Sequence, residues 1–80
     1  MKLTVLIRPK TGILDPQGEA VRASLVHLGF AVTGARIGRL VDLEIATDDE
    51  AAARHEVERM CAELLANPLI ESFEIVEEPA

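Results

Sequence analysis

Few side chains in this 80-residue sequence could do acid–base, nucleophilic or metal chemistry. His27 and His55 each lack neighbours at the spacing of a metal site. Cys61 is the only cysteine and lies in an apolar helical stripe between Met60 and Leu64, so we interpret it as a buried, unreactive thiol. The run Asp48-Asp49-Glu50 follows Thr47 and is explained by helix capping without a metal ion. The sequence predicts no catalytic residue, no metal site and no cofactor.

Four cationic residues form the remaining group that could bind something: Arg8, Lys10, Arg36 and Arg39. They flank two predicted loops, and if these loops meet, the four charges converge. One interpretation is that they are solvated charges at the ends of strands. The other is a docking patch for an acidic partner surface or for a phosphate-bearing ligand, both of which suit guanidinium groups.

Composition limits the class of protein. The chain is long enough for one small domain, residues 1–80, and its 49% hydrophobic residues suffice for a packed core. The net charge of −6 argues against binding to nucleic acid or to an anionic membrane surface. No apolar run approaches the ~20 residues of a membrane span, and a lone cysteine suits a reducing compartment. We therefore expect a cytoplasmic protein.

Hydrophobic periodicity predicts the elements that must position these residues. Alternation predicts strands at residues 2–8 and 69–77, followed by a polar tail at 77–80. Helical spacing predicts a helix at 16–28 that Gly29 ends. It also predicts a second helix that begins at the cap Thr47, carries Leu64 on its apolar face and ends at Asn67 in a left-handed conformation. Residues 30–46 alternate with a break, which fits two strands joined by a type II turn at Ile37-Gly38. The alternative is one long strand kinked at Gly34 or Gly38 by a bulge.

The order βαββαβ indicates an α+β, two-layer sandwich of the ferredoxin-like kind. Both helices are expected on one face of an antiparallel sheet, with Val21, Leu25 and Leu28 of the first helix facing the core. The other face, which includes Leu6, stays uncovered. We therefore expect association with another chain.

The stretch that begins the first helix contains an anomaly. Asp15 is a good N-cap and Pro16 suits the first helical position. Gly18 nevertheless follows in the first turn, where alanine would favour the helix by about 1 kcal/mol. Either this glycine is a tolerated irregularity, or a ligand or another chain approaches the backbone there.

Three segments together resemble the PurS family: GILDPQGEAV, VTGARIGRLVDLEI and MCAELLANPLIESFEIV. PurS is the small subunit of phosphoribosylformylglycinamidine synthase, the amidotransferase of purine biosynthesis. The resemblance implies a homodimer or dimer of dimers that bridges the large synthetase subunit and the glutaminase subunit. It would help ammonia pass between them during the ATP- and glutamine-dependent conversion of formylglycinamide ribonucleotide to formylglycinamidine ribonucleotide, without catalytic residues of its own.

The same resemblance suggests where partners would touch this chain. The expected interface residues lie in the three matching segments: Leu14, Asp15, Pro16, Gln17, Gly18, Arg36, Gly38, Arg39, Asn67 and Pro68. The alternative is an ACT-like regulatory module that binds an amino acid, since LDPQG between a strand and a helix is similar to the ACT ligand loop. In that pattern glycine directly follows proline, whereas Gln17 intervenes here.

Overall fold

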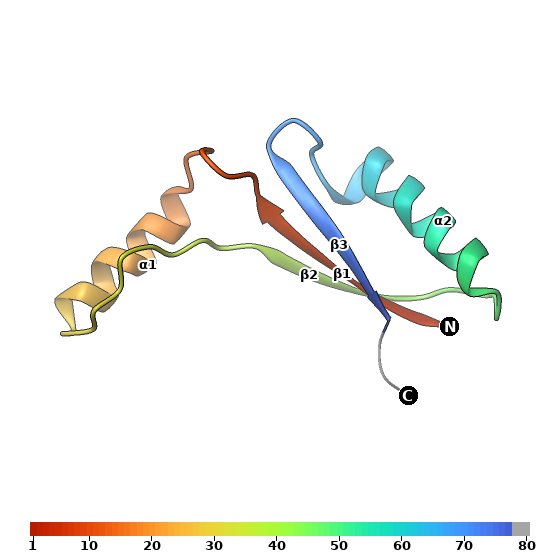
Figure 1. Cartoon of the computed structure of the whole chain (residues 1–80), viewed down its shortest axis with the longest axis horizontal. Coiled ribbons are helices and arrows are strands. Elements are labelled where there is room, and N and C mark those ends of the chain that lie inside the picture. The colour runs from red at the N-terminus through yellow and green to blue at the C-terminus, as the bar shows by residue number, and fades with distance from the viewer. Residues whose placement is uncertain (78–80) are drawn as a thin grey trace.

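β1 (Lys2–Pro9) is the central strand of a three-stranded antiparallel sheet with the order β2-β1-β3 (Figure 1). The computed structural model describes residues 1–77, so residues 78–80 of the predicted tail lie outside the described residues, whereas Glu77 ends the last strand. The other elements are α1 (Pro16–His27), β2 (Arg39–Glu44), α2 (Glu50–Met60), the π-helical turn η1 (Cys61–Leu65) and β3 (Glu71–Glu77). The predicted α+β, ferredoxin-like class is confirmed.

One face of β1 forms the core with α2. Leu3, Val5 and Ile7 alternate along the strand and are at most 1% exposed. They pack against buried residues of the helical segment and the residue after it, which are Ala53, Val57, Cys61 and Ala66. The opposite face carries Leu6, Leu40 opposite it on β2, and Val76, which lies opposite Thr4 on β3. No helix of the described chain covers this face.

α1 does not lie over the sheet, contrary to the expectation that both helices share one face. α1 and the returning residues 29–38 extend beyond the end of β1 as a separate arm, which we define as residues 10–38 (Figure 1). Val21 and Leu28, predicted to face the core, are 39% and 70% exposed. The radius of gyration is 15.7 Å, against about 12 Å for a compact domain of this length. The chain is therefore elongated, because its arm has no second layer to pack on.

Residues 30–38 form no strand, so the described chain has three strands where four were predicted. The ladder between β1 and β2 ends at the pair Ile7 and Arg39. Two residues after Ile7 on β1 is Pro9, which has no N–H to donate. The returning segment therefore runs extended beside α1 without a neighbouring strand.

Gly38 is neither in a positive-φ turn nor in a strand. Positive φ occurs among the described residues only at Gly12 and Gly29, so the predicted type II turn at Ile37-Gly38 is wrong. Gly29, with φ of 99°, ends the first helical segment as predicted. No continuous kinked strand is present either, because β2 begins at Arg39.

α2 differs from its prediction at both ends. Its N-cap is Asp49, whose carboxylate accepts from the Ala52 N–H at 3.2 Å, rather than Thr47. At the other end the chain widens into η1, which turns Leu64 outward, 83% exposed, although helical spacing placed it in the core. Over the described residues, neither helix has the length and apolar character needed to cross a membrane.

Candidate functional site

The Asp15 carboxylate joins the two sides of the arm. Asp15 caps α1 as predicted, with Oδ1 accepting from the Gly18 N–H at 3.0 Å. Its Oδ2 accepts from the Ile37 N–H at 2.8 Å, across 22 positions of sequence. The N–H groups of Gly18 and Ile37 hold the pKa of the Asp15 carboxyl below its ordinary value of 3.8, and the nearby charge of Arg36 lowers it further. One side chain therefore fixes both the start of α1 and the path of the returning segment.

Gly18 is buried because the same returning segment crosses it. A Cβ atom at this position would collide with the backbone carbonyl of Ala35 and crowd the Asp15 carboxylate. The glycine is therefore required by a close backbone approach, and the backbone that approaches is the chain's own. The interpretation of Gly18 as a tolerated irregularity is wrong.

Gly38 and Arg36 hold the junction between the arm and the sheet. A Cβ on Gly38 would collide with the carbonyl oxygen of Ile7, so this glycine lets the chain pass close to β1. Arg36 donates from Nη1 to the Pro9 carbonyl at 3.0 Å. A side chain thus takes the carbonyl at the point where the β1–β2 ladder has stopped.

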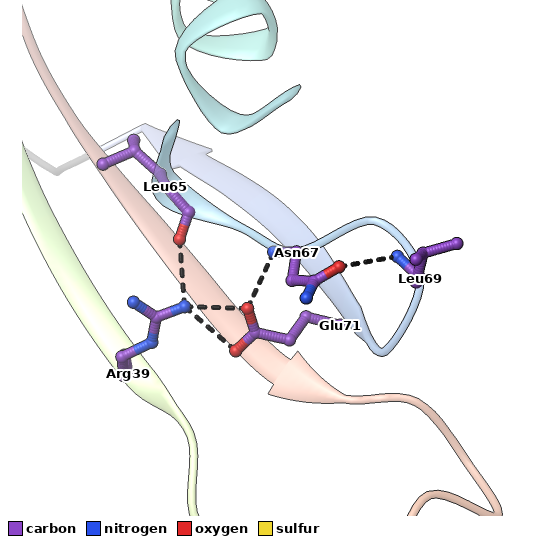
Figure 2. A network of polar contacts seen from close by, with 5 residues as sticks. All are labelled: Arg39, Leu65, Asn67, Leu69 and Glu71. Carbon is purple, nitrogen blue, oxygen red and sulfur yellow. Dashed lines mark hydrogen bonds and ion pairs between the residues drawn. The ribbon is translucent and has the colours of Figure 1, made fainter. Parts of the chain in front are cut away.

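Arg39 connects β2 to the loop between η1 and β3, as Figure 2 shows. Its Nη2 donates to the Leu65 carbonyl at 3.0 Å and to both carboxylate oxygens of Glu71 at 2.9 Å. The Asn67 N–H donates to Glu71 Oε1 at 2.8 Å. This N–H and the Arg39 guanidinium hold the pKa of the Glu71 carboxyl below its ordinary value of 4.5.

The loop itself is shaped by Asn67 rather than by a left-handed helix cap. Asn67 Oδ1 accepts from the Leu69 N–H at 3.1 Å, and its backbone carbonyl accepts from the N–H groups of Ile70 and Glu71. No residue other than glycine has positive φ in the described chain, so the predicted left-handed conformation of Asn67 is wrong. The Pro68 carbonyl accepts from Lys10 Nζ at 2.7 Å, which ties the loop to the start of the arm.

Three of the four cations singled out in the sequence do meet. Arg8, Arg36 and Arg39 line one hollow of about 390 Å³ at the junction between the sheet and the arm, together with Leu6, Pro9 and Leu40. Lys10 is held away from them by Pro68. We call this space the arginine hollow.

The predicted interface residues thus form two groups. Asp15 and Gly18 lie in the arm with Leu14, Pro16 and Gln17, which are exposed, and Leu14 is 83% exposed. Arg36 and Gly38 hold the junction. Arg39 reaches Asn67 of the loop through Glu71, and Pro68 is held by Lys10. Glu71 and Pro9 complete these contacts and were missed, because nothing in their local sequence indicates a partner so distant in the chain.

The chemistry-bearing side chains stay apart from these groups. Cys61 is fully buried, and burial, with a smaller contribution from Glu58, raises the pKa of its thiol, which is the opposite of activation. His27 and His55 are exposed. Across residues 1–77, no three His, Cys, Asp or Glu side chains gather in a way that could hold a metal ion.

A three-stranded sheet, a helix packed on one face and loops tied by Asp15 and Arg39 define a small ferredoxin-like α+β domain. The family model for PurS, described as phosphoribosylformylglycinamidine (FGAM) synthase, matches residues 2–78. The chain belongs to the PurS family.

Relatives from two organisms show the extent of the similarity. The phosphoribosylformylglycinamidine synthase subunit PurS of Methanocaldococcus jannaschii is 39% identical over 75 residues, covering 92% of this chain and 90% of that protein. The crystal structure of M. jannaschii PurS matches with a TM-score of 0.83 at 38% identity, over 94% of this chain and 92% of that one. A chain in the structure of PurLQS from Thermotoga maritima matches with a TM-score of 0.89 at 29% identity, over 96% of this chain and 95% of that one.

Replacing Gly18 by alanine tests the close approach of the Ala35 carbonyl. We expect Gly18→Ala to lower the free energy of unfolding by about 1–3 kcal/mol, because overpacking against backbone outweighs the gain in helix propensity. Gly34→Ala is the matched control, since a Cβ there has no heavy atom within 4 Å, and it should change stability by less than about 0.5 kcal/mol. Urea unfolding of both variants measures the difference. A Gly18→Ala variant more stable than the wild type would contradict this account.

The lowered pKa of Asp15 predicts an acid-sensitive arm. The ionised carboxylate stabilises the folded state fully above the ordinary pKa of 3.8, and this contribution is lost as the pH falls through the lower folded value. Asp15→Asn should therefore flatten the decline of stability as the pH falls below about 4, measured by urea unfolding. Because asparagine can still cap α1, hydrogen exchange should accelerate at the Ile37 amide more than at Gly18. Equal exchange at the two amides would argue against the bridging role.

Proposed function

We propose that this chain is the non-catalytic assembly subunit of the phosphoribosylformylglycinamidine synthase complex. In this role it bridges the large synthetase subunit and the glutaminase subunit and assists the transfer of ammonia between them. The reaction served is the ATP- and glutamine-dependent conversion of formylglycinamide ribonucleotide to formylglycinamidine ribonucleotide. We also propose a cytoplasmic location, which suits a biosynthetic subunit with a single unpaired thiol.

The observation that carries this proposal is the match to a chain of PurLQS from T. maritima over 96% of the present chain. The similarity is continuous from β1 to β3, so it covers the arm, the junction and the loop alike. The M. jannaschii relative is described as one of the subunits of formylglycinamide ribonucleotide amidotransferase, which supports the same role.

The geometry at the start of α1 favours this role over an amino-acid-binding ACT-like module. Such a module would need free backbone N–H groups near Gly18 to hold a ligand. Here the Asp15 carboxylate accepts from the N–H groups of Gly18 and Ile37, and the Ala35 carbonyl covers Gly18. The space and the donors that a ligand would use are therefore taken by the chain itself.

We propose further that the subunit is a homodimer or a dimer of dimers. Large apolar side chains of the arm remain uncovered in the single chain, with Leu28 at 70% and Phe30 at 59% exposure. The uncovered sheet face adds Leu40, at 60% exposure, and β2 and β3 each have a free edge in the described sheet. Apolar surface of this extent favours association.

Reconstitution from purified subunits tests the assembly role. With the synthetase and glutaminase subunits present, we expect glutamine-dependent synthesis to require this chain, because ammonia transfer depends on the bridged complex. Synthesis supplied with ammonium chloride should persist without it, since free ammonia needs no transfer. The chain alone should hydrolyse neither glutamine nor ATP. Undiminished glutamine-dependent synthesis in its absence would disprove the proposal.

Sedimentation velocity tests the oligomeric state. At micromolar concentration the isolated chain should sediment as two or four copies, because association buries the uncovered apolar residues. Phe30→Asp should shift it toward the monomer, whereas Ala31→Asp, at the exposed neighbouring position, serves as the control. A folded wild-type monomer at that concentration would contradict the dimer.

A further inference from the structure

We propose that the arginine hollow is a docking site for carboxylate side chains of a neighbouring protein, an acidic segment of the synthetase or the glutaminase subunit. The inference rests on the proposed function for the identity of that neighbour. Its basis in the structure is a concentration of unused hydrogen-bond donors at one place on an acidic chain.

The arginine hollow is a cationic site on the surface of a chain whose net charge is negative. The chain has 14 acidic and 8 basic residues, yet three of the basic ones line this hollow. Among the described residues that line it, none is acidic. An acidic partner segment is repelled by the chain's net charge elsewhere, so this site would set its position as well as attract it.

Most donors of the three guanidinium groups are free to bind. Each group has five N–H donors. Arg36 uses Nη1 for the Pro9 carbonyl, and Arg39 uses Nη2 for Leu65 and Glu71. Arg8 is exposed, and within residues 1–77 no hydrogen bond or ion pair engages its guanidinium group. These intrachain contacts fix two of the arginines in place, so a carboxylate meets donors that are already oriented.

The surroundings favour a protein carboxylate over a phosphate ligand. Phosphate sites are commonly built from converging backbone N–H groups. Here Pro9 has no N–H, and the nearby backbone presents the carbonyls of Ile7 and Pro9. Leu6 and the 60% exposed Leu40 add apolar surface beside the arginines. Arginine combined with apolar side chains is typical of protein–protein contacts.

A pair of charge reversals on one strand tests the proposal. Arg8→Glu places an acidic side chain in the hollow, and Lys2→Glu makes the same change in net charge on the same face of β1, about 20 Å away. Lys2 has only an exposed pair with Glu44, at 3.7 Å, so its loss affects folding little. Affinity for the synthetase and glutaminase subunits is measured with fluorescently labelled chain, and thermal melts establish that each variant is folded.

We expect Arg8→Glu to weaken binding to one of the two subunits by about tenfold or more, and Lys2→Glu by less than about twofold. The affinity of Arg8→Gln should fall between the affinities of the wild type and of Arg8→Glu. Added sodium chloride should weaken binding of the wild type more than binding of Arg8→Glu, because salt screens the charge pairing that the variant has lost.

Several results would overturn the proposal, and they separate it from the assembly role. If the wild-type chain binds neither subunit, both fail. If the wild type binds and Arg8→Glu binds equally well, or Lys2→Glu loses as much, only the docking site is wrong. A change confined to self-association would assign the hollow to a second copy of the chain. Binding of inorganic phosphate by the wild type and not by Arg8→Glu would assign it to a phosphate ligand.

Discussion

The structure depends on where β1 stops. Pro9 ends the strand with no N–H to continue the ladder toward β2, so the chain after Pro9 and the segment that precedes Arg39 both lie outside the sheet. The groups that the ladder would have paired are taken by side chains instead. Arg36 donates to the Pro9 carbonyl, and Asp15 accepts from the Ile37 N–H. The arm, the junction and the arginine hollow all follow from this substitution of side-chain contacts for a fourth strand.

The central sheet and α2 could be predicted from sequence because their signals are local. Alternating Leu3, Val5 and Ile7 specify the buried face of β1, and Gly29 specifies a chain reversal. The first turn of α1 also revealed its anomaly, since Asp15 and Gly18 lie three residues apart. What approaches Gly18 is Ala35, and no local pattern indicates which distant segment fills such a space.

The incorrect predictions have the same cause, because a local pattern does not identify the distant segment that a residue contacts. Val21 and Leu28 have helical spacing, but spacing cannot tell whether the partner surface belongs to the same chain. Leu64 points outward because the widened turn η1 rotates the helical face. Arg39 was recognised as a candidate, yet its partner Glu71 lies 32 positions away and carries no signal of the pairing. Membership of the PurS family, by contrast, was evident from three short segments spread over the whole chain.

The double hydrogen bond of Asp15 has a mechanical consequence. It joins α1 to the returning segment at the base of the arm, where Gly18 and Ala35 are also in contact. The arm therefore moves as one rigid unit rather than as a flexible loop. α1 has 12 residues and is about 18 Å long. A rotation of about 5° at the junction therefore moves the far end of α1 by about 1.6 Å, which amplifies a small motion at the base into a displacement as large as one helical rise per residue.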